Sequence, residues 1–425
     1  MKTSKYNYYI DCNNKYLFFN GLSKNYFEVS EENHESFRQI LMHPNDYAIK
    51  YTHFLSRMKE FGFVLDDEVD EFKKVVEAFT AYKQPDTYRL MIMPTYNCNL
   101  SCWYCIQHHQ NVNLTTLDIQ KIKEHIKTYL SKNKLTKFNL TWFGGEPLLK
   151  YKEIIEITKF AFEYCKQNDI KFWSDITTNG ILLNEHRIKE LHQYGIRSYQ
   201  ITIDGCREKH NRTKKIKDDS AFDKAINNIV SIVKLTTDTE CILRFNYDEN
   251  NLEPEKVIKD INALIPTEYH THIKFLTRKV WQQNPEKLNQ KAVTKLIESA
   301  KDHSYITDSS SAGLCYVDFL HFNCVFPNGK IGKCDNDSLE KAQGYFTEQH
   351  DIKWKEPQDF IAHHQFSEDS PCLECKHLPF CCGPCPNLRN NMIKQYHKLT
   401  CQYKNPDKEM QEQILRYCET NINLR

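Results

Sequence analysis

Three thiols lie within eight positions of the stretch TYNCNLSCWYC, at Cys98, Cys102 and Cys105. Three thiolates on one loop can hold three irons of a [4Fe–4S] cube and leave the fourth iron without a protein ligand. An iron left open in this way can chelate a small molecule directly. The alternative is a zinc site that a distant ligand such as His108 or His109 completes. The spacing by itself leaves both metals open.

Nine more cysteines lie close together in the last zone of the chain, from about residue 305 to 425, apart from Cys418 in its final amphipathic stretch. An irregular segment so rich in cysteine builds little apolar core, so we expect bound metal or clusters to hold its fold. In a reducing cytosol, clustered cysteines are more often metal ligands than disulfides. The nine are Cys315, Cys324, Cys334, Cys372, Cys375, Cys381, Cys382, Cys385 and Cys401.

Composition sets the outer bounds of the function. The chain has 425 residues, of which 40% are apolar and 27% are charged, and its formal net charge is +1. These are the values of a globular protein without the basic excess of a nucleic-acid binder. The stretch MKTSKYNYYIDCNNKY lacks the apolar part of a signal peptide, and no run of about 18 apolar residues is present. We therefore expect a cytoplasmic protein that binds neither membranes nor nucleic acid.

Strand and helix patterns alternate from about residue 87 to 304. Six β-rich runs, RLMIMPT, FNLTWF, FWSDITT, SYQITID, CILRFNY and HIKFLT, are separated by stretches with a 3.6-residue apolar period. Thr115 and Asp118 form a capping box at the start of the first such stretch. Successive βα units predict a parallel sheet covered by helices, as a barrel or a doubly wound sheet. The cysteine triplet follows the first strand, at the end where barrels carry their chemistry.

The CxxxCxxC spacing after a first strand, with the aromatic Tyr104 before the last cysteine, resembles the radical S-adenosylmethionine (SAM) enzymes. The resemblance implies an α/β fold with a partial (β/α)6 TIM-like barrel over residues 86–304. It also implies a [4Fe–4S] cluster on Cys98, Cys102 and Cys105 that binds SAM. Reductive cleavage of SAM would then give a 5′-deoxyadenosyl radical, which removes hydrogen from an unactivated C–H bond.

The GGEP segment after the second strand fits the same family. By resemblance, Gly144, Gly145, Glu146 and Pro147 lie beside the methionyl part of SAM. The glycines would allow close backbone approach, and the Glu146 carboxylate would face the ammonium group of SAM. Apart from the resemblance, GGEP is an ordinary turn between a strand and a helix.

Polar residues at the ends of the next strands complete the expected SAM site. By resemblance, Thr178 and Asn179 of TTNG lie near the ribose. A helical pattern follows them, which favours a βα loop over the hairpin that Asn-Gly otherwise signals. Asp204 ends the fourth strand, and Arg244 in the fifth could pair with the SAM carboxylate through its bidentate fork. A salt bridge within the barrel is the alternative for both.

The C-terminal cysteines resemble the SPASM domain, which carries auxiliary iron–sulfur clusters. Its pattern is matched by Cys315-x13-Gly329-x4-Cys334, Cys372-x2-Cys375-x5-Cys381-x3-Cys385 and Cys401. The resemblance implies a distal [4Fe–4S] cluster on Cys372, Cys375, Cys381 and Cys401, and a nearer one on Cys315, Cys334 and Cys385. A pair of zinc knuckles is the alternative.

Three residues around the nearer cluster have open roles. Cys324, in the strand-like FNCVFPNG, is either a buried thiol, which we favour, or a fourth ligand. Without that ligand, an open iron could bind a peptide cysteine and promote thioether formation. Cys382 is expected to be a bystander. Asp335 matches in position a carboxylate that accepts a proton in sulfatase-maturing relatives, and the alternative is one more solvated acid.

Residues 1–85 contain strand-like pieces (YNYYI, KYLFF, NYFEV) followed by helical stretches and GFVLDDEVDEF. This order resembles the PqqD-like winged-helix domain, which binds a leader peptide as an added strand; an adaptor or dimerisation domain is the alternative. With a SPASM region over 305–425, the resemblance implies an enzyme that crosslinks or oxidises a ribosomally made precursor peptide, using electrons from flavodoxin or ferredoxin. A sulfatase-type maturase and a zinc-stabilised scaffold without catalysis are the other candidates.

Overall fold

The computed structural model describes residues 1–12, 14–107, 109–216, 218, 220–282, 287–308, 314–355, 366–368 and 370–421. Contacts divide the chain into two compact units. The first comprises Met1–Pro85, Ser310–Leu320 and Gln358–Arg425, and the second comprises Asp86–Ser309 and His321–Pro357. The division into domains at 1–85, 86–304 and 305–425 stays a prediction, and the cysteine-rich C-terminal zone contributes to both units. Among the described helices, none is both long and apolar enough to cross a bilayer.

The second unit is an α/β structure built on one large sheet. Its strands are β6 (Thr87–Ile92), β7 (Lys137–Trp142), β8 (Lys171–Thr178), β9 (Ile196–Ile203), β10 (Glu240–Tyr247), β11 (Ile273–Lys279), β12 (Ile306–Asp308), β13 (Phe322–Val325), β14 (Ile331–Gly332), β15 (Gly344–Phe346) and β16 (Ile352–Trp354). Strands β6 to β12 are parallel and adjacent in chain order. Strand β13 joins the free edge of β6 in parallel, and β14 to β16 continue antiparallel. The predicted parallel sheet is confirmed, and the six predicted strands are β6 to β11.

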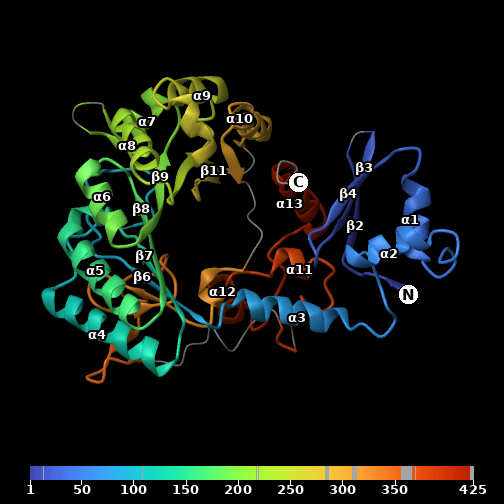
Figure 1. Cartoon of the computed structure of the whole chain (residues 1–425), viewed down its shortest axis with the longest axis horizontal. Coiled ribbons are helices and arrows are strands. Elements are labelled where there is room, and N and C mark those ends of the chain that lie inside the picture. The colour runs from blue at the N-terminus through green and yellow to red at the C-terminus, as the bar shows by residue number, and fades with distance from the viewer. Residues whose placement is uncertain are drawn as a thin grey trace. The chain divides into compact units, whose positions relative to one another are not determined.

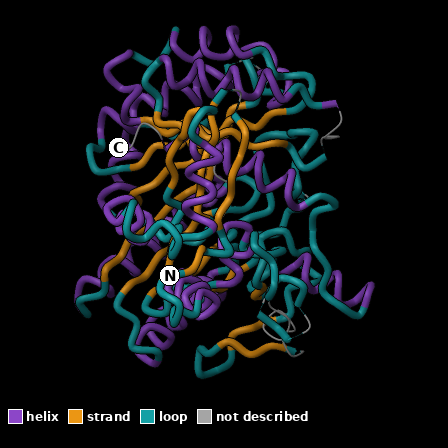
Figure 2. Tube along the Cα trace, turned by 90° about the vertical axis from the view of Figure 1, so that its right-hand side faces the viewer, coloured by secondary structure: helices purple, strands orange, loops and turns teal. Residues whose placement is uncertain are grey.

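Helices follow the strands of the second unit, as the alternation predicts. They are α4 (Thr116–Lys132), η1 (Pro147–Lys150), α5 (Tyr151–Gln167), α6 (Glu185–Gln193), α7 (Arg207–Lys214), α8 (Ala221–Leu235), α9 (Pro254–Asn262), η2 (Thr267–His272) and α10 (Gln290–Asp302). Figure 1 shows α4, α5 and α6 along the outer side of strands β6 to β9, and Figure 2 shows the strands side by side with helices around them. The capping box is confirmed, because Thr115 and Asp118 each accept a hydrogen bond from the other's backbone amide.

The two faces of this sheet differ in chemistry. The face under the helices carries a continuous apolar core that includes the fully buried Phe138, Trp142 and Ile201. On β8 and β9 the intervening side chains are only half buried and several are polar, among them Asp175 and Gln200. A parallel sheet covered on both faces carries apolar side chains on both. The polar second face therefore indicates that this side of the sheet lines a site.

The first unit contains small antiparallel sheets and helices. Its elements are β1 (Lys2–Thr3), β2 (Asn7–Asp11), β3 (Lys15–Asn20), β4 (Tyr26–Ser30), α1 (His34–Met42), α2 (Thr52–Glu60), β5 (Val64–Leu65), α3 (Glu71–Tyr82), η4 (Tyr316–Asp318), α11 (Leu378–Cys381), α12 (Pro386–Tyr396) and α13 (Pro406–Asn421). Strands β2, β3 and β4 form one sheet, and β1 pairs with β5. The predicted strand pieces and helices are confirmed, whereas the PqqD-like fold stays a prediction. One apolar cluster joins Phe19 of the sheet to Phe380 of α11 and Ile414 of α13.

Candidate active site

The cysteine loop, residues 97–113, leaves the carboxyl end of β6 and returns to α4. An antiparallel bridge between Thr95 and Asn113 closes its base. Burial raises the pKa of Cys98 to about 12, and the nearby Cys102 and Cys105 add to the rise. Burial also raises the pKa of the other two thiols. Three partly buried thiols that oppose each other's ionisation need positive charge to become thiolates. The donor set therefore fits a metal cluster bound by three sulfurs.

Both histidines that were named as possible zinc ligands belong to the cysteine loop. The Nε2 atom of His109 lies 3.4 Å from the Sγ atom of Cys105, and His108 lies outside the described residues. Within the described ranges, no three His, Cys, Asp or Glu side chains converge on a single metal ion. A zinc ion requires all its ligands to converge on one point. A [4Fe–4S] cube does not, because each of its sulfur ligands binds a separate iron.

The glycine pair of GGEP packs against the cysteine loop. A Cβ atom on Gly145 would lie 2.2 Å from the carbonyl oxygen of Asn97, and one on Gly144, which has φ +125°, would lie 2.6 Å from that of Thr95. The Gly145 amide donates to the Thr95 carbonyl at 3.0 Å, and the Glu146 amide donates to that of Asn97 at 2.8 Å. The close approach that requires glycine is thus made to the protein's own backbone.

Glu146 is fully buried and connects GGEP to TTNG. Its carboxylate accepts hydrogen bonds from the Leu148 amide at 3.0 Å, the Thr178 hydroxyl at 2.8 Å and the Asn179 amide at 2.8 Å. Burial raises the pKa of Glu146, and these donors oppose the rise. The Asn179 side chain in turn donates to Asn99 Oδ1 of the cysteine loop at 2.8 Å. Three loops from successive βα units are therefore held together, and TTNG is a βα loop as predicted.

A buried charged pair lies beside the cysteine loop. Lys214 Nζ is 2.8 Å from Asp204 Oδ2, with side-chain exposures of 3% and 1%. The Tyr104 hydroxyl donates to Asp204 Oδ1 and accepts from Lys214 at 3.4 Å and from Asn246 at 3.1 Å. Burial alone would lower the pKa of Lys214, but Asp204 raises it well above its usual value. The ammonium also opposes the rise that burial causes in the pKa of Cys102. The predicted barrel salt bridge of Asp204 thus exists, with Lys214 as its partner.

Arg244 and Asp335 belong to the same unit as the cysteine loop. Arg244 Nε donates to Asn246 Oδ1 at 2.9 Å, and burial together with Arg278 lowers the pKa of its guanidinium. Asp335 contributes to the charges around Arg244, and its backbone carbonyl accepts from Gln107 of the cysteine loop at 3.4 Å. The structure therefore places Asp335 next to the loop.

Four C-terminal cysteines line one cavity in the first unit. The cavity has a volume of about 40 Å³, and its cysteines are Cys372, Cys375, Cys381 and Cys401. Burial raises the pKa of Cys381 to about 11, and the nearby Cys372 and Cys375 thiols add to the rise. The Cys375 sulfur accepts from the His377 amide at 3.4 Å, the kind of bond that tunes iron–sulfur sites. These are the four residues predicted for the distal cluster. Cys382 is not among the cavity's lining residues.

The residues predicted for the nearer cluster are divided between the units. Cys315 and Cys385 lie in the first unit, and each immediately precedes a helical turn. A buried ion pair between Asp318 and Arg389, at 2.5 Å, joins those two turns. Cys334 belongs to the second unit. There Cys324 of β13 is fully buried, and the neighbouring Asp335 and Cys334 add to the rise that burial causes in its pKa.

Comparison with known proteins identifies the second unit's core. Residues 92–261 match the family model of the Radical SAM superfamily. The chain contains a radical SAM domain. A GTP 3′,8-cyclase of Clostridium perfringens (strain SM101 / Type A) is 32% identical over 171 residues, which are 38% of this chain and 48% of that protein. The chain thus spans about half the length of the first curated relatives that it matches.

Three further matches, one curated relative and two solved structures, extend beyond the radical SAM domain. A cysteine-type anaerobic sulfatase-maturating enzyme of Clostridium perfringens (strain 13 / Type A) is 23% identical over 340 residues, covering 71% of this chain and 90% of that enzyme. The solved structure of native anSMEcpe with bound AdoMet and Kp18Cys peptide is similar with a TM-score of 0.57, at 19% identity over 80% of this chain and 99% of that one. Streptococcus suis SuiB bound to precursor peptide SuiA is similar with a TM-score of 0.51, at 15% identity over 95% and 100%. Both solved structures share the fold of this chain.

Sequence reasoning missed Lys214 and Asn246, which surround Tyr104 in the radical SAM domain. The signal for Lys214 was available. Helix α7 is strongly polar, yet it follows a buried strand, and His210 and Lys214 lie four residues apart on one face of it. A polar helix that must still bury one face buries charged or hydrogen-bonding side chains there. Asn246 had no signal of its own, because its contact with Tyr104 joins residues 142 positions apart.

Proposed function

We propose that this chain is a radical SAM enzyme that modifies a ribosomally made peptide or a protein. The observation that carries the proposal is the set of three thiols at the carboxyl end of β6, packed against GGEP and TTNG and beside a buried ammonium. When bound, a reduced [4Fe–4S] cluster and SAM supply a 5′-deoxyadenosyl radical that takes hydrogen from an unactivated C–H bond. The polar face of the sheet offers the space for a substrate.

Each residue of the site has a defined task in this proposal. Cys98, Cys102 and Cys105 hold three irons. Arg244 and the ammonium of Lys214 attract the SAM carboxylate, because both cations lie beside the cysteine loop. Of the two, only Lys214 is paired with Asp204, so Arg244 has the charge that is free to bind the carboxylate. Tyr104, whose hydroxyl is bound by three neighbours, forms a fixed wall.

The GGEP and TTNG loops complete the SAM site in the proposal. Gly144, Gly145 and Pro147 shape the first loop. Glu146 keeps the loops in register, and its Oε2 atom, which accepts one hydrogen bond in the structure, can accept another from the SAM ammonium. Thr178 and Asn179 position the ribose.

The auxiliary cysteines have electron-transfer and substrate tasks. Cys372, Cys375, Cys381 and Cys401 close a site without a free position, which suits a cluster that passes electrons. Asp335 beside the cysteine loop is proposed to accept the proton when the substrate radical is oxidised. Closed water-poor surroundings protect such radicals, and the buried network around Glu146 and Asp204 provides them.

The substrate class is inferred from the proteins that this chain resembles. SuiB, which shares the fold over nearly all of this chain, was solved with a precursor peptide. We propose a precursor peptide whose leader binds residues 1–85 and whose core receives a crosslink or an oxidation. The alternative is maturation of a sulfatase, because the sulfatase-maturating relative aligns over 90% of its own length.

Anaerobic reconstitution tests the proposal. The full chain is loaded with iron and sulfide and incubated with SAM, a reductant and either a precursor peptide encoded beside this gene or a cysteine-containing sulfatase peptide. We expect 5′-deoxyadenosine together with a mass loss in one of the peptides. C102A should abolish both products, whereas C165A, which alters a buried thiol of the helix-side core, should retain them. A colourless, zinc-loaded chain that leaves SAM intact would contradict the proposal.

A further inference from the structure

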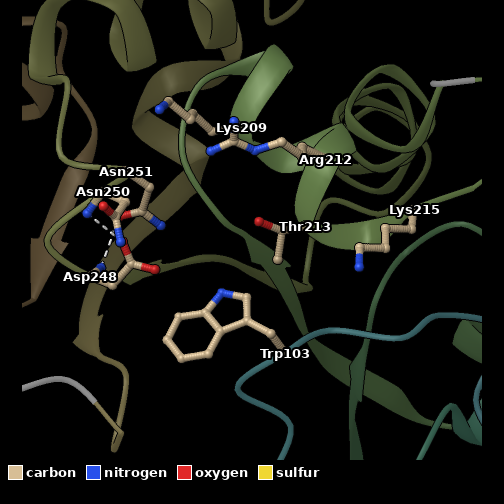
Figure 3. A pocket seen from close by; sticks show the side chains of 8 residues that line it. All are labelled: Trp103, Lys209, Arg212, Thr213, Lys215, Asp248, Asn250 and Asn251. Carbon is tan, nitrogen blue, oxygen red and sulfur yellow. Dashed lines mark hydrogen bonds between the residues drawn. The ribbon is translucent and has the colours of Figure 1, made fainter.

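A basic cavity lies beside the cysteine loop, at Trp103. It has a volume of about 310 Å³ and is lined by Trp103, Lys209, Arg212, Thr213, Lys215, Asp248, Asn250 and Asn251. Figure 3 shows the Trp103 ring at its base, between the loop that follows β10 and the helix α7 that carries the cations. We call this cavity the Trp103 pocket.

Three cations and one carboxylate are among the residues that line the Trp103 pocket. In the described part of the chain, Lys209, Arg212 and Lys215 make no ion pair within 4 Å, and only the buried Asp248 opposes them among the lining residues. Two described carboxylates close to the pocket in sequence pair with lysines that do not line it: Glu208 with Lys256 at 3.3 Å and Asp218 with Lys224 at 2.8 Å. Unpaired cations around a concave surface attract an anionic partner.

Trp103 connects this surface to the interior site. It stands between Cys102 and Tyr104 in the chain and is 55% exposed, although large aromatic side chains are usually buried. Its ring contacts the Tyr104 ring edge-on, with centroids 5.7 Å apart. Tyr104 points the other way, into the network of Asp204 and Lys214. Consecutive residues of one loop thus face the outside and the reaction site, so the loop itself is the wall between them.

We propose that the Trp103 pocket is the docking surface for an acidic one-electron carrier protein, which reduces the centre held by the cysteine loop. The inference rests on the proposed function, because only a redox centre at Cys98, Cys102 and Cys105 gives the carrier something to reduce. One electron leaves the carrier and enters the centre through the Trp103 side of the loop. No bond is made or broken, and no proton needs to move.

The geometry favours a carrier over a substrate segment. A substrate must bring its reacting carbon to the polar face of the sheet, where Asp335 and Arg244 lie, whereas the Trp103 pocket is lined by neither of these residues nor by those proposed to bind SAM. Electron transfer needs proximity alone, and the wall at Trp103 is one residue thick. An exposed indole surrounded by cations also suits a partner with an exposed flavin ring and an acidic rim, through stacking and charge steering.

Charge reversal tests the docking surface in the full, cluster-loaded chain. The variant K209E/R212E/K215E is compared with K134E/K166E/K171E, which makes the same charge change at three exposed lysines, one before β7, one in α5 and one at the start of β8. Reduction is followed as bleaching of visible absorbance in an anaerobic stopped-flow instrument, with flavodoxin hydroquinone as the carrier. We expect the second-order rate constant at low salt to fall about ten- to a hundred-fold for the pocket variant, with a weaker salt dependence. The control variant should change it less than about threefold.

Photoreduced deazariboflavin, a small neutral reductant, separates docking from chemistry. It should reduce wild type and both variants at similar rates and support equal 5′-deoxyadenosine formation. Equal flavodoxin rates for the pocket and control variants would overturn the docking surface alone. A pocket variant that weakens precursor-peptide binding and leaves the flavodoxin rate unchanged would also overturn it, in favour of a peptide subsite. If the small reductant finds no centre to bleach in wild type, the proposed function itself fails.

Discussion

Replacement of Lys214 by methionine is expected to leave a buried carboxylate without its counter-charge. Methionine keeps most of the side-chain volume and removes the ammonium. Asp204 would then keep the Tyr104 hydroxyl as its remaining side-chain donor, in a place where both partners are at most 3% exposed. His210 is a poor replacement for the lost charge, because its burial, which K214M does not change, is the largest cause that lowers its pKa.

The expected cost follows from the burial of the pair. Breaking a buried ion pair by removing one partner destabilises a protein by about 3–5 kcal/mol, because the other charge stays in a poorly solvated place. K214M should therefore lower the free energy of unfolding by about that amount, and D204N by a comparable one. The double variant K214M/D204N removes both charges, so it should cost less than the sum, with a coupling free energy of about 2 kcal/mol.

The assay is urea unfolding of the cluster-free chain under anaerobic conditions, with hydrogen exchange of peptides covering β9 and α7 to localise the loss. K256M is the matched control, because it removes an exposed lysine that pairs with Glu208 on the surface, and it should leave stability unchanged. Stability losses of K214M and D204N that add exactly in the double variant would refute the buried ion pair. A K214M protein as stable as K256M would refute it as well. Either result would show that Asp204 is solvated or paired in another way.

Three further perturbations give separate tests. G145A places a methyl group 2.2 Å from the Asn97 carbonyl, so the cysteine loop must move, and iron and acid-labile sulfide per chain should fall after reconstitution. C401A should lose about four irons per chain, one cluster, whereas C382A should retain them, as measured by colorimetric iron analysis. Burial lowers the pKa of His125 from 6.5 to about 4, so the unfolded chain binds the extra proton first as pH falls. The contribution of His125 to the free energy of unfolding is therefore complete at pH 7 and about 2 kcal/mol smaller at pH 5. Thermal melts of wild type and H125Q at both pH values should show a smaller pH dependence of stability in the variant.

The regular elements could be predicted because burial imposes a period on the sequence. Ile122 and Ile126 repeat at helical spacing in α4, and both are fully buried. The loops that carry the site could be located for a related reason: strands end where the apolar run ends, so CxxxCxxC, GGEP and TTNG had to lie at one edge of a parallel sheet. Both arguments use only local patterns.

What could not be predicted are the contacts between side chains distant in sequence. The partners of Glu146 lie in the same loop and in the next βα unit, so its motif alone could not show that it binds three protein donors. The motif that groups Cys315 with Cys334 likewise gave no hint that they belong to different compact units. Such contacts depend on how the loops fold over one another, which a single sequence does not record.

The conformation of the cysteine loop is set by its neighbours and not by the cysteines. The described residues of the loop form no helix or strand. The Gly145 amide donates to the Thr95 carbonyl just before the loop, and the loop backbone accepts hydrogen bonds from the Glu146 amide and from the Gln282 side chain, which donates to the Tyr104 carbonyl at 2.9 Å. A fourth bond joins Asn179 to Asn99. These donors come from three different βα loops, so the ordering of the cysteine loop accompanies the folding of the sheet. A metal centre then binds to thiols already held near one another, and the entropy of loop closure does not oppose it. Substitutions of the residues that make these hydrogen bonds should therefore weaken metal binding, as loss of a thiol does.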